Sequence, residues 1–107
     1  MIIDFTQALI QYDGTVIRDG TGVNEKDAIL RTVVTNSLMV EESGVDGETK
    51  LKRHILARNI HENDTYDLSS EQITEIKRLA AIVYPTIIAG PLWEMIDPKE
   101  EEDQPQE

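Results

Sequence analysis

The stretch Ser69–Ile96, "SSEQITEIKRLAAIVYPTIIAGPLWEMI", carries the clearest structural signals in the chain. Ser69 and Gln72 have the spacing of a capping box, which satisfies free backbone N–H groups at the start of a helix. Apolar residues then recur at the spacing of one buried helical stripe: Ile73, Ile76, Ala80 and Val83. Pro85 should end or kink this helix, because proline lacks an amide N–H and clashes with the preceding turn.

Residues 86–96 are mostly apolar and predict a further helix. Gly90 and Pro91 fall inside it, so one kinked helix and two short helices, the second beginning at Pro91, both stay open. Most of the segment suits the core, but its apolar positions occupy more than one stripe, and a short chain has limited surface to cover them. We therefore predict that Leu92, Trp93 and Met95 are anchors for a partner protein or for a second copy of the chain.

Two helices are predicted upstream. Asn24 is a good N-cap, and the apolar positions that follow it form one stripe: Ile29, Leu30, Val33, Val34 and Leu38. The second helix covers roughly residues 48–60, with an inner face formed by Leu51, Ile55, Leu56 and Ile60. Residues 61–67 are polar and predict a loop.

The second of these helices also holds four of the ten basic residues in the chain: Lys50, Lys52, Arg53 and Arg58. We predict that they form a solvated basic face, with attraction to acidic groups of the chain or of a partner as an alternative. Surface ion pairs are weak singly, at about 0–1 kcal/mol each, so only several together would hold such a contact.

The N-terminal segment is predicted to be extended. Ile2–Phe5 and Thr15–Arg18 are rich in β-branched and aromatic residues. Asp13 and Gly14 form a turn signal between them, so we expect a small hairpin or two short extended pieces. The elements together predict an α+β fold, mainly helical, with a short N-terminal β-hairpin packed on three or four helices.

The last residues, 98–107, have two prolines and no aliphatic or aromatic side chain, and half of them are acidic. Such a segment cannot bury anything, and we predict a disordered acidic C-terminal tail. Residues 1–97 are then one small globular domain, as the length of 107 residues suggests.

The charge and composition exclude several classes of protein. The formal net charge of −11 repels nucleic acid and anionic membranes, so we expect neither as a direct partner. The chain has no cysteine, which excludes disulfides and favours an intracellular protein. No apolar run approaches the roughly 20 residues of a membrane span, and Asp4 precedes any basic residue, unlike in a signal peptide. We predict a cytoplasmic protein.

No motif in the sequence identifies a catalytic, metal-binding or phosphate-binding site. His54 and His61 are seven residues apart with Glu62 and Asp64 nearby, but they lack the spacing of a known metal motif. The serines lie outside any nucleophile motif, and the glycines do not form a phosphate-binding loop. We predict no enzyme activity, no catalytic residues, no cofactor and no metal.

Three segments carry a resemblance: "DGTVIRDG" (13–20), "ETKLKRHILARNI" (48–60) and the stretch "YDLSSEQITEIKRLAAIVYPTIIAGPLWEMID" (66–97). They resemble a family of small acidic, uncharacterised proteins encoded by tailed bacteriophages and prophages. Pro85 and Pro91 depart from the continuous last helix of that family. The resemblance implies a phage origin and a place in the cytoplasm of the bacterial host cell, and it supplies no catalytic residues.

These observations lead to three hypotheses on function. The first is a non-enzymatic phage protein that acts through protein–protein interaction, as an assembly or accessory factor. The second is an acidic inhibitor that mimics nucleic acid and occupies the nucleic-acid-binding surface of a host protein. The third is a small metal-binding protein or hydrolase. The identity of the partner and the oligomeric state stay open.

Overall fold

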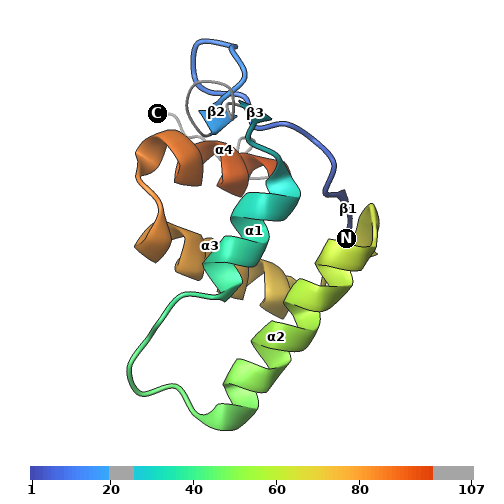
Figure 1. The fold of residues 1–107 in the computed structure, drawn as a ribbon, viewed down its shortest axis with the longest axis vertical. Coiled ribbons are helices and arrows are strands. Elements are labelled where there is room, and N and C mark those ends of the chain that lie inside the picture. The colour runs from blue at the N-terminus through green and yellow to red at the C-terminus, as the bar shows by residue number, and fades with distance from the viewer. Residues whose placement is uncertain (20–25, 98–107) are drawn as a thin grey trace, which may run out of the picture.

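The chain folds into four helices with short antiparallel strand pairs among the residues that the structure describes, 1–19 and 26–97 of a computed structural model (Figure 1). This arrangement confirms the predicted α+β, mainly helical fold. The elements in chain order are β1 (Ile2–Asp4), β2 (Arg18–Asp19), β3 (Lys26–Asp27), α1 (Leu30–Leu38), α2 (Gly47–Glu62), β4 (Thr65–Asp67), α3 (Ser70–Val83) and α4 (Thr86–Ile96).

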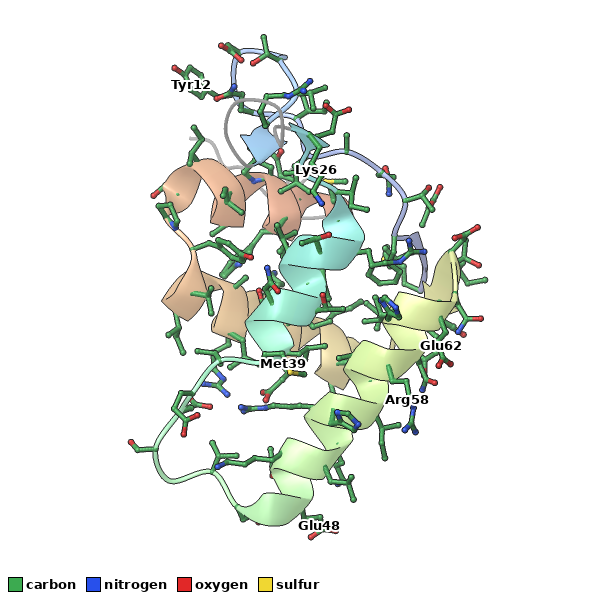
Figure 2. The ribbon with its side chains drawn as sticks, viewed as in Figure 1. Tyr12, Lys26, Met39, Glu48, Arg58 and Glu62 are labelled. Carbon is green, nitrogen blue, oxygen red and sulfur yellow. The ribbon has the colours of Figure 1, made fainter. Side chains whose placement is uncertain are left out.

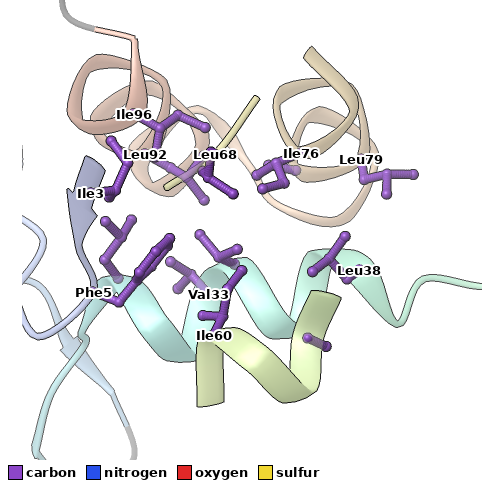
Figure 3. Packing of buried hydrophobic residues seen from close by; sticks show 14 of the residues in the cluster. Ile3, Phe5, Val33, Leu38, Ile60, Leu68, Ile76, Leu79, Leu92 and Ile96 are labelled. Atoms are coloured by element: carbon purple, nitrogen blue, oxygen red, sulfur yellow. The ribbon is translucent and has the colours of Figure 1, made fainter. Parts of the chain in front are cut away.

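The buried apolar side chains form one cluster around α1, which packs against α2, α3 and α4. Figure 3 shows the labelled side chains of α1, α3 and α4 facing one another across this core. The largest fully buried apolar side chains come from every part of the chain: Phe5, Leu9, Leu30, Val34, Ile60, Leu68, Ile76, Leu79, Leu92 and Ile96. Since burial drives folding through the apolar area removed from water, this cluster is the main source of stability.

The N-terminal strand has a different neighbour from the one expected. β1 pairs with β4 in antiparallel register, with Ile3 opposite Tyr66, instead of pairing with the segment around Thr15. The predicted polar loop over residues 61–67 was therefore wrong at both ends, because residues 61–62 continue α2 and residues 65–67 form β4. The pairing with β4 places Ile3 in the core.

The predicted Asp-Gly turn is confirmed. Gly14 has a φ of 89°, and the Gln11 N–H donates to the Thr15 carbonyl at 2.9 Å. Ile10 and Val16 then face each other as an isolated antiparallel bridge. Glycine suits this position because a side chain at positive φ is strained. A second antiparallel pair joins β2 to β3.

The first helix begins later than predicted. It starts at Leu30, after Ile29 in extended conformation. The residues before it are extended because the Ala28 N–H donates to the Ile17 carbonyl and the Leu9 N–H to the Ala28 carbonyl, each at 2.8 Å. The N-cap predicted at Asn24 and the tail predicted over residues 98–107 both lie outside the described residues.

The predicted inner face of the second helix was half right. In α2, Leu56 and Ile60 are buried, together with Ala57, but Leu51 is 56% and Ile55 38% exposed. Asp46 begins the helix by accepting a hydrogen bond from the Thr49 N–H at 2.8 Å. α2 therefore contacts the core through one stripe and presents further apolar side chains outside it.

The last two helices follow the sequence signals closely. The Gln72 N–H donates to the Ser69 hydroxyl at 3.1 Å, and the Gln72 side chain accepts from the Ser69 N–H at 2.9 Å, which confirms the capping box. α3 ends before Pro85, and α4 is one helix that contains Pro91. The question left open by Gly90 and Pro91 is settled in favour of a single helix.

Candidate functional site

A groove of about 540 Å³ lies between α2 and α3. It arises because α1 packs against both helices, while a side-chain hydrogen bond from Arg53 to Glu75 joins α2 to α3. Its apolar lining comes from Leu38, Leu56, Ile55 and Tyr66. Lys52 and Asn59 line it on the α2 side and Glu71 on the α3 side. This mixture of apolar and charged surface is typical of a binding site for a peptide or small molecule.

One wall of the groove is held by a buried arginine. Arg53 of α2 is only 7% exposed. Its Nε donates to Glu75 of α3 at 2.9 Å, and its Nη2 donates to Glu42 of the α1–α2 loop at 3.0 Å. A single guanidinium therefore ties three segments of the chain together.

A second arginine completes a network of two arginines and two glutamates. Arg78 donates to Glu42 Oε2 at 2.6 Å and to Glu75 Oε1 at 3.3 Å. Hydrogen bonds from Arg78 and then from Arg53 lower the pKa of Glu42 from 4.5 to about 2. Because the charges cancel, the network keeps this wall of the groove in place without adding net charge to it.

The basic face predicted on α2 is not a single surface. Arg53 lies in the network, so its prediction as part of a solvated face was wrong. Lys50, Lys52 and Arg58 are exposed but lie on different sides of the helix. The contact predicted between the acidic tail and this face lies outside the described residues.

The three predicted partner anchors lie in or against the core. Leu92 is fully buried, so its side chain offers no surface to a partner. Trp93 and Met95 are partly buried and pack against the core cluster. The Trp93 indole N–H donates to the Lys77 carbonyl at 3.0 Å, and the Lys77 ammonium lies 4.4 Å from the centre of the indole ring. For Trp93 and Met95, partner binding stays a prediction.

A second hollow, of about 570 Å³, lies between the Asp-Gly turn and α4. Ile10, Tyr12 and Ile87 are exposed there. One of its walls is a turn and not a helix, and Tyr12 at its edge is 92% exposed, so its side chain has little support. The groove between α2 and α3 has two helical walls and is the better-formed site.

Many carboxylates are engaged within the chain. Asp4, Asp13 and Asp46 accept hydrogen bonds from nearby Thr residues, and these bonds lower the pKa of each carboxyl. Others form ion pairs: Asp27, Glu42, Asp64, Asp67, Glu75 and Asp97. A mimic of nucleic acid needs carboxylates that are free for a partner, so these contacts give that hypothesis no support and it stays a prediction.

The histidines considered as metal ligands lie apart. His54 and His61 are separated by about 10 Å along the axis of α2, at 1.5 Å per residue. Within the described part of the chain, no group of three or more His, Cys, Asp or Glu side chains could hold a metal ion. Among the same residues, no helix combines the length and the apolar character that a bilayer crossing requires.

Comparison with known proteins adds no relative. No family model, no curated protein and no solved structure matches the chain. The resemblance to phage proteins is therefore neither supported nor contradicted, and the function has to be argued from the chain itself.

Sequence reasoning missed the role of Arg53, although a signal for it was present. Arg53 precedes Leu56, Ala57 and Ile60 by three, four and seven residues, which places it on the buried face of α2. A charged residue at such a position needs a partner, because burying an unpaired charge is costly. The sequence does not show which carboxylates fill that role, and in the structure they are Glu42 and Glu75.

Proposed function

We propose that the protein is a non-enzymatic interaction protein that binds an amphipathic helical segment of a partner in the groove between α2 and α3. The observation that carries this proposal is the apolar lining from Ile55 and Leu56 between two helical walls. Grooves of this kind take the apolar face of a helix, with anchors three, four and seven residues apart. The resemblance of the sequence alone supports a phage origin and a place in the cytoplasm of the host cell.

The charges at the edges of the groove favour one kind of segment. Lys52 is exposed on the α2 edge and Glu71 on the α3 edge. A bound helix would therefore carry an acidic residue along one flank and a basic residue along the other. Such complementary charges set orientation and partner choice more than they set affinity.

Two of the polar groups that line the groove are committed to structure, which argues for binding over catalysis. The Ser69 hydroxyl caps α3, and Glu75 is paired with Arg53. A nucleophile needs an adjacent base that is free to take its proton. Neither group has that freedom, so the groove is better suited to recognition.

Site-specific photo-crosslinking in the host cell would test this function. A photoreactive residue at Asn59, inside the groove, should give an adduct of defined mass, and one at Ile82, exposed on α3 outside it, should not. The charge reversal Lys52→Glu should reduce the Asn59 adduct several-fold, because it removes one complementary contact. Equal adducts from Asn59 and Ile82, or no effect of Lys52→Glu and of Glu71→Lys, would contradict the proposal.

A further inference from the structure

The side of α2 that faces away from the core is partly apolar. Leu51 and Ile55 lie one turn apart there and are 56% and 38% exposed. The buried stripe of α2 lies on the opposite side, through Arg53, Ala57 and Ile60. We call Glu48, Leu51, Ile55 and Arg58 the outer face of α2, because 3.6 residues per turn places these four on one side of the helix.

Charged residues of opposite sign stand at the two ends of this face. Glu48 lies in the first turn of α2, and Arg58 lies about 15 Å further along the axis, at 1.5 Å per residue. Figure 2 shows Glu48 at the lower end of α2 and Arg58 on the side away from α1. Within the described part of the chain, neither side chain forms an ion pair.

The spacing of these four residues makes the outer face complementary to itself. The pair Glu48 and Arg58 and the pair Leu51 and Ile55 have the same midpoint, at the level of Arg53. If a second α2 lies antiparallel across this midpoint, Leu51 of one copy meets Ile55 of the other, and Glu48 meets Arg58. A two-fold axis repeats both contacts, as in an isologous interface.

We infer that two copies of the chain associate through antiparallel α2 helices in this register. Opposite charges then meet at both ends of the contact, and the apolar pairs meet at its centre, which is the arrangement found in most interfaces. The outer face shares Ile55 with the proposed partner groove, whereas Glu48, Leu51 and Arg58 do not line that groove, so substitutions at these three positions test the dimer separately from the groove.

The charge distribution favours a second copy on α2 over contact elsewhere. Two chains with a net charge of −11 repel each other. The outer face of α2 carries one acidic and one basic residue, Glu48 and Arg58, so a contact between two such faces brings no net charge together. The contact is small, and we expect a weak, reversible dimer of the class that buries less than about 1,200 Å².

Sedimentation equilibrium of the full chain over a wide concentration range would test the inference. Wild-type protein should show a monomer–dimer equilibrium, and Leu51→Glu should weaken it about tenfold or more, because a charge replaces an apolar contact at the centre. Ile82→Glu is the matched control, since Ile82 is 55% exposed on α3, and it should change the dissociation constant less than about twofold. Circular dichroism verifies that both variants fold.

Charge reversal tests the register itself. Glu48→Arg or Arg58→Glu alone should weaken the dimer roughly fivefold or more, because each places like charges opposite each other twice. The double variant restores both pairs and should return the dissociation constant to within about threefold of wild type. A wild-type chain that stays monomeric at every concentration, or a double variant as weak as the single ones, would overturn the inference.

Discussion

α4 and α2 show that the apolar character of a helix and its exposure are separate properties. α4 is the more apolar of the two, and Leu92 in it was predicted to anchor a partner, yet Leu92 is fully buried, as is Ile96. α2 was predicted to bury Leu51 and Ile55, and both are exposed. Exposing a helix rich in apolar residues to water costs the most free energy, so such a helix is buried preferentially. Exposed apolar surface remains at Leu51 and Ile55 of α2 and, near the start of α4, at Ile87.

The two helices are also held in different ways. α4 is held by apolar packing, with Trp93 donating to the Lys77 carbonyl and Lys77 paired with Asp97. The first half of α2 extends beyond the core, and the Arg53 network connects it to α3. Figure 1 shows this part of α2 running below the other helices. Substitutions should therefore destabilise α4 mainly through lost apolar packing and α2 mainly through lost ion pairs and hydrogen bonds.

The largest effect is expected in the core contact of α4. Leu92→Ala removes a fully buried side chain and should lower the free energy of unfolding by about 3 kcal/mol. Leu51→Ala, the same change on the exposed face of α2, should cost less than about 0.5 kcal/mol. Urea denaturation followed by circular dichroism measures both, and similar losses would contradict the contrast between the helices.

A smaller loss is expected at the Arg53 network. Arg53→Ala should lower the free energy of unfolding by about 2 kcal/mol, less than for a deeply buried pair, because Arg78 still neutralises part of the charge on Glu42 and Glu75. Lys52→Ala, on the neighbouring exposed position, is the control and should stay within about 0.5 kcal/mol. If both variants had equal stability, the network would not be what holds α2 to α3.

Local signals predicted the parts of the fold that depend on neighbouring residues. The capping box at Ser69, the turn at Gly14 and the helix end before Pro85 are each determined by a few adjacent side chains and backbone groups. Apolar periodicity likewise predicted α1 and α3, whereas the inner face of α2 was half right and α4 was predicted from its apolar composition. These features confirm that the fold class could be obtained from the sequence.

Long-range pairing could not be predicted in the same way. β1 and β4 are short, and nothing in the polar segment around Thr65 distinguishes a strand from a loop before β1 is placed beside it. The groove has the same origin, because it depends on how far apart α2 and α3 lie across α1. Arg53 is the intermediate case, since its position on the buried face could be seen but its partners could not.

The smallest predicted effect is a dependence of stability on pH through Glu42. Its folded pKa of about 2 lies below the ordinary 4.5, so the ionised group favours the folded state above pH 4.5, and this contribution falls as the pH drops toward 2. The stability difference between wild type and Glu42→Gln should therefore be constant above about pH 5 and shrink below it. Arg78 contributes most to the low pKa, so in an Arg78→Gln background the shrinkage should be smaller. An unchanged pH profile in that background would assign the low pKa of Glu42 to Arg53 and would show that Arg78 does not contribute to it.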